Sequence, residues 1–371
     1  MKVVVNSYDL AEAVNKVSKA VATKDINGKI LEGIKLVAQY DKLMLTAFDS
    51  EMSIETTIAC ESFSDGEMVV AGKIFAEYVN KVATANGEVE IDEQANGQAK
   101  ITCGKVKFTI STMNAKEFPI INTELQENAL EIEVSEFKRL VAQTAFCAST
   151  DGARPILKGC LIEAKNDKEL IVYALDGFRL AKSAGKANSV HGTIKCVVPA
   201  RALNEMVKLI GADEKNVKIF SEKNHIMLKT GETILTARLL VGQFVDCDKL
   251  LSSPCDKTII ANRDELISAL DRMSILAKTA NNLIIVKAFG HTLYLNANTE
   301  IGNIEEDLEI EKIGNDVQFA LNYKYLLDIL KAINEKEVKI CVNRETTPLF
   351  IRSEAENAKF DYLVMPVRVG R

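Results

Sequence analysis

The sequence has little of the material from which catalytic and metal sites are made. Its 371 residues include no tryptophan, three histidines and eight cysteines, and no two cysteines form a CxxC pair. This spacing argues against a zinc ribbon or a thioredoxin-like site, and we expect the cysteines to be reduced and mostly buried. No HExxH, GxSxG, GxGxxG or GxxxxGKS/T pattern occurs. We therefore expect no metal and no cofactor.

Long hydrophobic runs are also missing. None approaches the roughly 18 residues that a bilayer-spanning helix needs, and the apolar stretch at the N-terminus is too short for a signal peptide. The chain is 47% hydrophobic and 26% charged, a composition typical of folded cores. We expect a soluble cytoplasmic protein of two or three domains, at about 150 residues per domain. Its net charge of -6 by itself argues against nucleic acid.

What the sequence does contain is a weak internal repeat. An extended apolar run, a polar residue and an amphipathic helix pattern occur near Leu10 and again near Phe137 and Leu266. A second helix pattern in each unit is centred on Phe75, Leu203 or Leu326, and strand patterns lie between and after the helices. The repeat predicts three units, residues 1–125, 126–252 and 253–371. Two helices among many strands favour an α+β fold with antiparallel sheets and the helices on one side.

The predicted helices differ in charge from the rest of the chain. Residues 7–24, 72–83, 135–148, 199–210, 262–278 and 322–333 together carry +5, which leaves -11 for the remainder. Lys73, Arg201 and Lys324 stand two residues before the apolar anchor of their helices, on the opposite face. For any one helix an ordinary solvated face explains such charges. Their recurrence in three units favours a shared basic surface that attracts phosphates without reading bases.

Four motifs together resemble the bacterial DNA polymerase III beta subunit family, the sliding clamps. They are the stretches Leu175-Asp176-Gly177-Phe178-Arg179-Leu180-Ala181, Arg154-Pro155-Ile156-Leu157-Lys158-Gly159, Phe108-Thr109-Ile110-Ser111-Thr112-Met113 with Glu117-Phe118-Pro119, and Tyr362-Leu363-Val364-Met365-Pro366-Val367-Arg368. The likeness covers the whole chain. It implies the DNA clamp fold, in which two chains pair head to tail and six units form a ring with the helices lining the hole.

The resemblance also implies a function and its partners. The family encircles duplex DNA without sequence preference, slides along it and tethers DNA polymerase III through its alpha subunit. Other polymerases, repair factors and proteins with a clamp-binding motif use the same hydrophobic cleft, and a clamp loader opens the ring. The clamp is a non-catalytic subunit without a cofactor, and it has no membrane partner.

The same resemblance assigns site residues. A partner-peptide cleft would use Leu157, Leu175, Gly177, Phe178, Arg179, Leu180, Val245, Leu250, Leu363, Met365, Pro366, Val367 and Arg368. The dimer interface would use Phe108, Ile110, Ile275, Leu276, Glu300, Glu305 and Glu306. DNA contacts would be Lys24, Lys73 and Arg154, to which the helix projection adds Arg201, Lys208 and Lys331. Lys73 is a candidate for both DNA and the dimer.

The sequence departs from the family pattern at two places. The family usually has Gly-x-Phe-Pro-x-Tyr followed by basic residues, whereas this chain has Gly242-Gln243-Phe244-Val245-Asp246-Cys247-Asp248-Lys249, and Phe178 replaces a common histidine. Two rival functions remain open at this point. One is an enzyme that uses Asp49 or Asp176, which fall at equivalent points of their units, and the other is a peptide-binding scaffold that does not encircle DNA.

Overall fold

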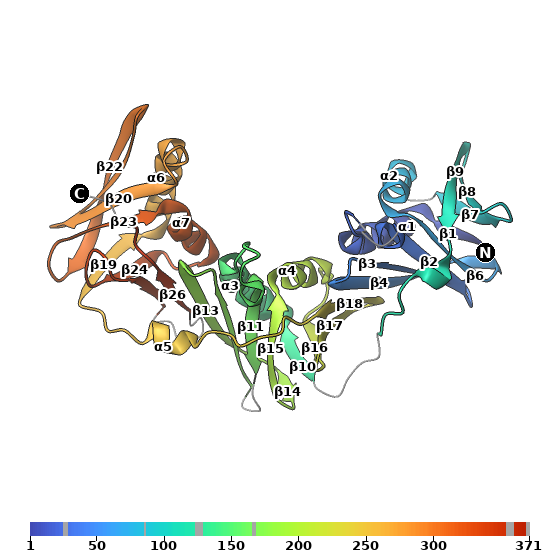
Figure 1. Cartoon of the computed structure of the whole chain (residues 1–371), viewed down its shortest axis with the longest axis horizontal. Helices are drawn as coiled ribbons and strands as arrows, with labels where there is room; N and C mark the ends of the chain where they lie inside the picture. Colours follow the sequence, from blue (N-terminus) through green and yellow to red (C-terminus); the bar gives the residue numbers. More distant parts are fainter. Residues whose placement is uncertain (25–28, 85–86, 123–128, 165–167, 354–359, 369–371) are drawn as a thin grey trace. The chain divides into compact units, whose positions relative to one another are not determined.

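Strands and short helices follow one another in an order that repeats along the chain (Figure 1). The computed structural model describes residues 1–24, 29–84, 87–122, 129–164, 168–353 and 360–368. The α-helices are α1 (Ser7–Val17), α2 (Gly72–Val82), α3 (Val134–Thr144), α4 (Ala200–Leu209), α5 (Cys247–Leu251), α6 (Arg263–Ala277) and α7 (Tyr323–Ala332). Short 3-10 turns are η1 (Ser18–Ala20), η2 (Ile30–Glu32), η3 (Ala115–Glu117), η4 (Ala145–Cys147) and η5 (Pro155–Lys158).

The strands are short and numerous. The first third of the chain contains β1 (Lys2–Asn6), β2 (Gly33–Gln39), β3 (Lys42–Phe48), β4 (Met52–Ala59), β5 (Glu61–Ser64), β6 (Gly66–Ala71), β7 (Glu88–Gln94), β8 (Gln98–Cys103) and β9 (Val106–Met113). The middle third contains β10 (Ala129–Glu133), β11 (Gly159–Ala164), β12 (Glu169–Leu175), β13 (Arg179–Lys186), β14 (Ser189–His191), β15 (Ile194–Pro199), β16 (Asn216–Ser221), β17 (His225–Thr230) and β18 (Thr233–Arg238). The last third contains β19 (Lys257–Asn262), β20 (Leu283–Phe289), β21 (Thr292–Thr299), β22 (Gly302–Ile313), β23 (Val317–Asn322), β24 (Glu337–Val342), β25 (Leu349–Arg352) and β26 (Phe360–Val364).

The six predicted helices all form, because their apolar residues recur at helical spacing, and asparagine side chains cap the starts of α1, α6 and α7. Asn6 accepts the backbone N–H groups of Tyr8 and Asp9, and Asn262 caps α6 in the same way. A side-chain oxygen at this position satisfies backbone donors that have no partner inside the helix.

The chain packs as two compact units, which differ in outline from the three predicted repeats. Unit 1 comprises Met1–Val134 and Asn204–Leu239, and unit 2 comprises Ser135–Leu203 and Leu240–Arg371. The predicted boundary at 125/126 lies outside the described residues.

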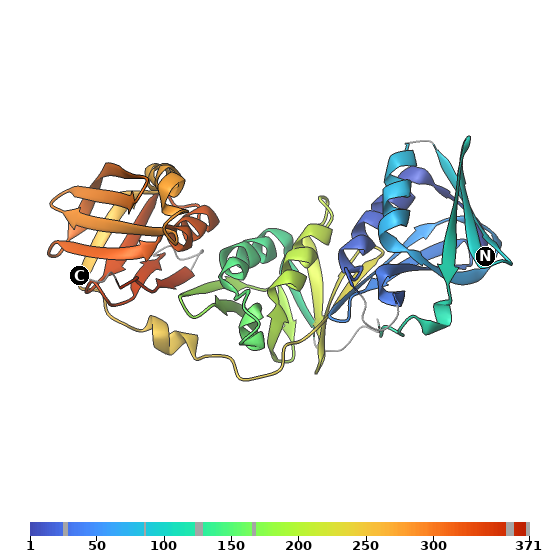
Figure 2. The ribbon, with the colours of Figure 1, turned by 45° about the horizontal axis from the view of Figure 1, so that its top comes forward.

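In unit 1 the sheet runs in the order β10-β16-β17-β18-β4-β3-β2-β6-β9-β8-β7-β1-β5, and neighbouring strands in this order are antiparallel. Helices α1 and α2 lie side by side against it, as Figure 2 shows for the blue end of the chain. Leu10, Val14 and Phe75 point into the core and are fully buried. The helical stripe that the sequence indicated is therefore the face that packs on the strands.

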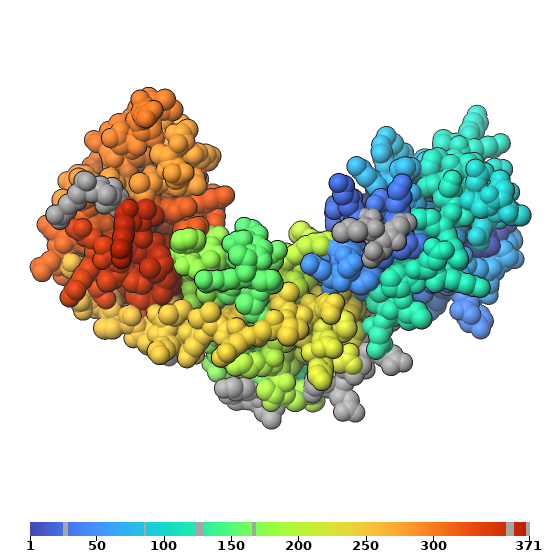
Figure 3. Space-filling model, viewed as in Figure 1, coloured from blue at the N-terminus to red at the C-terminus, as the bar shows by residue number. Residues whose placement is uncertain are grey.

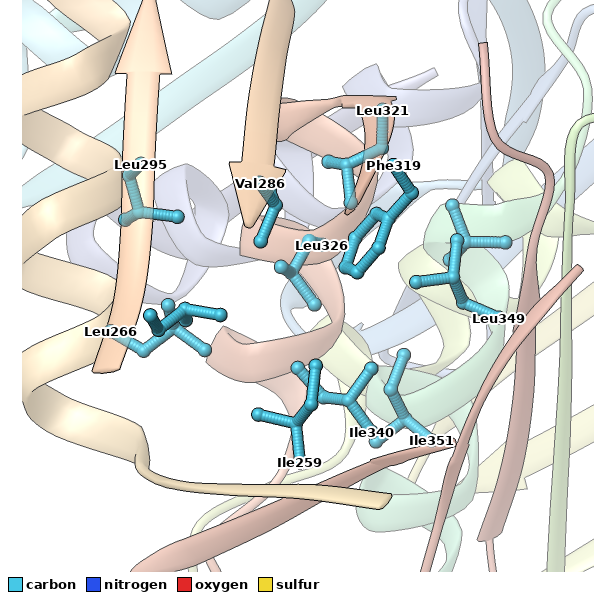
Figure 4. Close-up of a pocket in the computed structure, with 12 residues that line it drawn as sticks. Ile259, Leu266, Val286, Leu295, Phe319, Leu321, Leu326, Ile340, Leu349 and Ile351 are labelled. Atoms are coloured by element: carbon cyan, nitrogen blue, oxygen red, sulfur yellow. The ribbon is translucent and has the colours of Figure 1, made fainter. Parts of the chain in front are cut away.

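In unit 2 the sheet order is β15-β11-β12-β13-β26-β25-β24-β19-β22-β21-β20-β23. Helices α6 and α7 pack together, and α6 covers β21 and β22. Leu266, Phe319, Leu326 and their neighbours converge between these layers (Figure 4). The space left among them is about 10 Å³, barely one water molecule. This is a packed core and not a ligand site.

Two strand pairs join one predicted repeat to the next. In unit 1, β4 pairs with β18 so that Ile54 faces Leu235. In unit 2, β13 pairs with β26 so that Ala181 faces Tyr362. We call these pairs the first and the second seam. Each seam is a continuous antiparallel ladder that connects two repeats tightly. The boundary between the two compact units therefore runs through the second repeat instead of between repeats.

One expectation about the cysteines is wrong. Cys255 and Cys341 form a disulfide, with their Cα atoms 5.6 Å apart. The other cysteines of the described chain form no disulfide, and Cys103 alone among them is half-buried. Within the same residues no helix is both long and apolar enough to cross a membrane.

Candidate peptide-binding, closure and nucleic-acid surfaces

Four leucines that the sequence assigned to the partner cleft meet in one buried cluster of unit 2. Leu157, Leu175, Leu180 and Leu363 are at most 7% exposed, and Leu251 and Cys247 of α5 pack with them. We call this the leucine cluster. Because these side chains are already covered, only the exposed residues around them are available for contact with another molecule.

Those exposed residues surround the leucine cluster on three chain segments. Phe178 is 61% exposed in the turn before β13, Val245 precedes α5, Leu250 lies on α5, and Met365 and Val367 follow β26. The backbone N–H of Met365 donates to the carbonyl of Phe178 at 2.8 Å, so the turn and the C-terminal tail are adjacent. Figure 3 shows the yellow segment that contains α5 exposed along the surface. Pro366 is half-buried and Arg368 exposed.

Arg179 was predicted to contact a peptide, but its guanidinium is engaged inside unit 2. Nε donates to Asp176 at 3.1 Å, Nη1 to Asp328 at 2.7 Å and Nη2 to the carbonyl of Phe146 at 2.7 Å. The group also lies 4.7 Å from the ring centroid of Tyr325, a cation–π distance. With 11% of its side chain exposed, Arg179 joins the turn before β13 to α7.

The turn before β13 is built to display Phe178. Asp176 accepts the backbone N–H groups of Phe178 and Arg179 at 2.8 and 2.9 Å. Gly177 takes φ +95°, a left-handed conformation that glycine adopts without steric penalty. The ring of Phe178 stacks on Tyr325 at 6.4 Å between centroids. The cleft prediction included Gly177 and Phe178 but missed Tyr325 and Asp328.

Helix α5 is fastened to the sheet of unit 2 by residues at which the chain departs from its family pattern. Asp246 caps the helix by accepting the N–H of Lys249. Asp248 accepts from the Tyr173 hydroxyl at 3.1 Å and from Lys182 at 2.8 Å. Burial acts to raise the pKa of Asp248, but the hydrogen bond and charge of Lys182 outweigh it and hold this pKa below its usual value. Asp248 therefore stays ionised and anchors α5.

The dimer residues assigned from the sequence lie at two incompletely paired sheet edges. In unit 1, β9 pairs with β6 only through Thr112 and Met113, so within the described residues 106–111 have β8 on one side only. In unit 2, β19 pairs with the last four residues of β22, and residues 302–309 have only β21 beside them among the described strands. An edge of this kind presents backbone N–H and C=O groups to another strand.

Side chains at the β9 edge are apolar on the face that meets α2. Phe108 stacks on Tyr78 at 4.5 Å between centroids, and Ile110 is buried. Ile74 of α2 and Val106 of β9 are exposed and extend this patch. The sequence prediction missed Ile74 and Tyr78. Ile74 lies one residue from the buried Phe75, about 100° around the helix, so an isoleucine off the apolar stripe was the available signal.

The β22 edge combines apolar and acidic side chains. Ile275 on α6 is 67% exposed and Leu276 is half-buried. Glu306 pairs with Arg272, and Glu305 accepts from Asn296 at 2.8 Å. Glu300 lies exposed in the turn between β21 and β22.

The six basic residues predicted to meet DNA are all exposed. Lys24, Lys73 and Lys208 belong to unit 1, and Arg154, Arg201 and Lys331 to unit 2. Lys208 pairs with Glu205 at 2.8 Å, and Lys331 with Asp271 at 3.4 Å. Each of these ion pairs is exposed on its lysine side, where solvent screens the attraction, so the ammonium groups remain accessible to phosphates.

The two carboxylates considered for catalysis have structural partners. Asp49 accepts the backbone N–H groups of Glu51 and Met52, as Asp176 does in its own turn. Both stabilise a turn between two strands. Among the described residues no group of three His, Cys, Asp or Glu side chains could hold a metal ion.

Sequence models of one family match nearly the whole chain. The N-terminal domain of the DNA polymerase III beta subunit matches residues 1–122, the central domain residues 131–246 and the C-terminal domain residues 249–368. The chain belongs to the DNA polymerase III beta subunit family. This confirms the resemblance and the three-repeat clamp fold of mixed α+β type predicted from sequence.

Known relatives are similar to this chain over nearly the whole length of both proteins. A beta sliding clamp from Staphylococcus epidermidis is 29% identical over 352 residues, which cover 91% of this chain and 92% of the relative. Two crystal structures cover 100% of both chains at a TM-score of 0.92. One is a DNA polymerase III beta subunit from Eubacterium rectale with 32% identity, and the other is the Bacillus subtilis DNA polymerase sliding clamp with 29% identity.

Family membership makes this chain a sliding clamp of DNA replication, a processivity subunit without catalytic activity. Asp49 and Asp176 are therefore turn residues in a binding protein. Membership does not by itself assign individual site residues, which have to be argued from their geometry.

Proposed function

We propose that two copies of this clamp close head to tail into a ring around duplex DNA, and that the exposed residues around the leucine cluster capture partner peptides. The observation that carries this proposal is the pair of open edges on β9 and β22. Each seam joins a strand from the middle of one repeat to the last strand of the next repeat, β4 to β18 and β13 to β26. In the third repeat the strand equivalent to β4 and β13 is β22, and in the first repeat the last strand is β9. Neither of these two strands takes part in a seam.

The seams also provide the register of the missing pair. Ile54 and Ala181 are the third residues of β4 and β13, and they face Leu235 and Tyr362, the third residues of β18 and β26. By the same rule the third residue of β22, Ile304, faces the third residue of β9, Phe108, of another copy. Glu305 then faces Lys107.

The chemistry of both faces agrees with this register. Phe108 and Ile304 are half-buried on the helix side of their sheets, whereas Lys107 and Glu305 are exposed on the other side. An apolar pair and an opposite-charge pair directly across an antiparallel ladder each contribute about 0.2–1 kcal/mol. Because β9 would meet β22 and not a second β9, the contact is heterologous, and a ring closes when the rotation permits.

DNA is bound in this proposal through phosphates. The exposed lysines and arginines of the helices lie on the layer that faces away from the sheets, and contacts to phosphate carry no base sequence. A clamp that slides needs this kind of contact, since base-specific hydrogen bonds would hold it at one site. Lys73, in the first turn of α2 beside Ile74, stays a candidate for both DNA and the closing joint.

Partner peptides would bind across Phe178, Val245, Leu250, Met365 and Val367. These side chains give an apolar surface that Leu and Phe anchors of a short peptide can cover. The partners proposed are the alpha subunit of DNA polymerase III, other polymerases and repair factors with such peptides, and the clamp loader, all in the cytoplasm. A peptide scaffold that does not close has no explanation for the matched edges.

Solution mass tests the ring. We expect a mass near twice 40.8 kDa by light scattering. Ile275→Asp should shift the protein to monomer, because it places a charge in the apolar part of the joint. Val241→Asp, at another exposed apolar residue of unit 2, is the matched control and should leave the dimer intact. A wild-type protein that stays monomeric at high concentration would contradict the proposal.

A further inference from the structure

The disulfide between Cys255 and Cys341 lies beside the proposed peptide site. Cys255 belongs to residues 252–256, which we call the linker segment, between α5 and β19. Cys341 is on β24, directly opposite Thr258 of β19. Cys341 belongs to the same buried cluster as Leu251 and Leu363, and the half-buried Cys255 packs against that cluster. The bond therefore ties the segment that follows α5 to the sheet beneath it.

Hydrogen bonds from two side chains hold the rest of the linker segment. Arg352 Nη2 donates to the carbonyls of Leu251 and Ser253 at 2.6 and 3.0 Å. Asn343 donates to the carbonyl of Pro254 and accepts the N–H of Asp256, each at 2.8 Å. These hydrogen bonds attach the linker segment to the sheet in addition to the covalent link. The disulfide adds a constraint that can be removed without detaching α5.

The two sulfurs differ in access. Cys341 is 9% exposed, whereas Cys255 is half-buried and lies in a segment whose neighbours Ser252, Ser253, Pro254 and Asp256 are exposed. Cys255 is therefore the more accessible of the two residues to a small thiolate in solvent. Thiol–disulfide exchange starts by the attack of such a thiolate and passes through a mixed disulfide, so Cys255 is the entry point.

We propose that Cys255 and Cys341 are a reversible redox site, which exchanges with small thiols and disulfides of the glutathione class and sets how firmly α5 presents Val245 and Leu250. This inference rests on the proposed peptide site and cytoplasmic location. Disulfides of cytoplasmic proteins are usually transient and redox-sensing.

The chemical step is balanced as follows. On oxidation, the two protein thiols lose two protons and two electrons, one S–S bond forms, and the bond of one small disulfide breaks to give two small thiols. On reduction, a small thiolate attacks Cys255 and releases Cys341, and a second small thiol restores Cys255 while the small disulfide forms. Two thiols need van der Waals separation, so the reduced linker segment has to move outward from the cluster.

Movement of the linker segment would loosen the residues before it. Leu251 is the last residue of α5 and packs in the leucine cluster, and Leu250 and Val245 depend on that helix for their positions. Side chains that are already held in the conformation that binds a peptide lose less conformational entropy when the peptide binds. The oxidised clamp should therefore bind a Leu- and Phe-anchored peptide about five- to tenfold more tightly than the reduced clamp.

Two measurements on the full chain test the redox site. First, the protein is equilibrated in glutathione buffers of graded ratio, and its free thiols are counted by alkylation and mass spectrometry. Two of the eight cysteines should change together, and peptide mapping should identify Cys255 and Cys341. Second, amide hydrogen exchange over residues 245–256 should be slower in the oxidised protein. A thiol count that never changes by two, or equal exchange in both states, would overturn the proposal.

The link to peptide binding has its own controls. The double variant Cys255→Ser with Cys341→Ser should bind the peptide like the reduced wild type and ignore glutathione. Cys103→Ser, which removes a half-buried thiol of unit 1, should keep the full redox response. Equal peptide affinity in both wild-type states would overturn the regulatory role. A peptide that binds in neither state would refute the proposed peptide site, whereas the thiol count and hydrogen exchange would still decide the redox site.

Discussion

At the scale of single residues, the site depends on charged groups that sequence patterns do not mark as special. Arg179 connects three segments of unit 2, and Phe178 beside it stays exposed. Its planar guanidinium group can donate hydrogen bonds in several directions while it stacks on aromatic rings. We expect its substitution to affect stability and peptide binding together, because both depend on the same turn.

Arg179→Ala should lower the unfolding free energy of the protein by about 3 kcal/mol, because it leaves Asp176 and Asp328 without their cation. Arg179→Lys should recover part of this loss, since an ammonium restores charge but neither the fork nor the stacking. The measurement is denaturant unfolding, together with titration of the peptide.

Arg154→Ala is the matched control, because Arg154 is an exposed arginine of the same compact unit. It should change the unfolding free energy by less than about 0.5 kcal/mol. If Arg179→Ala were no worse than Arg154→Ala, the network would be unimportant for the fold. A peptide affinity unchanged by Arg179→Ala would show that the turn does not position Phe178.

At the scale of helices and strands, the sequence carried much of the fold. Apolar residues at helical spacing predicted six helices, and alternation predicted the strands, because each of these signals is local. Helix α5 was missed because five residues are too few to show a period. Its anchors are Tyr173 and Lys182, more than 60 residues from Asp248, and no local pattern relates residues so far apart.

Long-range pairing explains the other differences. Cys255 and Cys341 are 86 residues apart, and the spacing of eight cysteines cannot identify which two meet. Strand patterns were predicted between and after the helices, but not which strands pair across the seams, since alternation fixes which face a residue takes and not which strand lies beside it. For the cleft, the motifs predicted residues of which four leucines do come together in unit 2, but the burial of those leucines and the engagement of Arg179 depend on packing.

The register proposed for β9 and β22 can be tested by cross-linking. In a variant with Lys107→Cys and Glu305→Cys, the two new thiols of neighbouring copies should face each other and form intermolecular disulfides under mild oxidation. Gel electrophoresis without reductant should then show a species of twice the chain mass.

The matched control combines Lys107→Cys with Glu309→Cys, which lies on the same face of β22 four residues further along. It should cross-link poorly, because four residues of strand span about 13 Å. Each single variant should remain a monomer on the gel and measures the background from native cysteines. More efficient linkage through residue 309 would mean that the register is wrong.

At the scale of the whole molecule, the net charge is a poor indicator of DNA binding, whereas the distribution of the charges along the chain is a useful one. A net charge of -6 argues against DNA only when it is spread evenly. Here the helices carry the positive share, and exposed lysines and arginines stand on them in both compact units. A ring has two surfaces, and only the helical one has to meet phosphates.

The central claim is that this clamp holds DNA by enclosing it, and retention on plasmids of different topology tests it most directly. The labelled protein is loaded onto a nicked circular plasmid by its ATP-dependent loader, and the complex is separated from free protein at moderate salt. The circle is then cut once with a restriction enzyme. The account predicts that the protein stays on the circle and leaves rapidly after linearisation, because it slides off the ends. Equal retention on circular and linear DNA would contradict it.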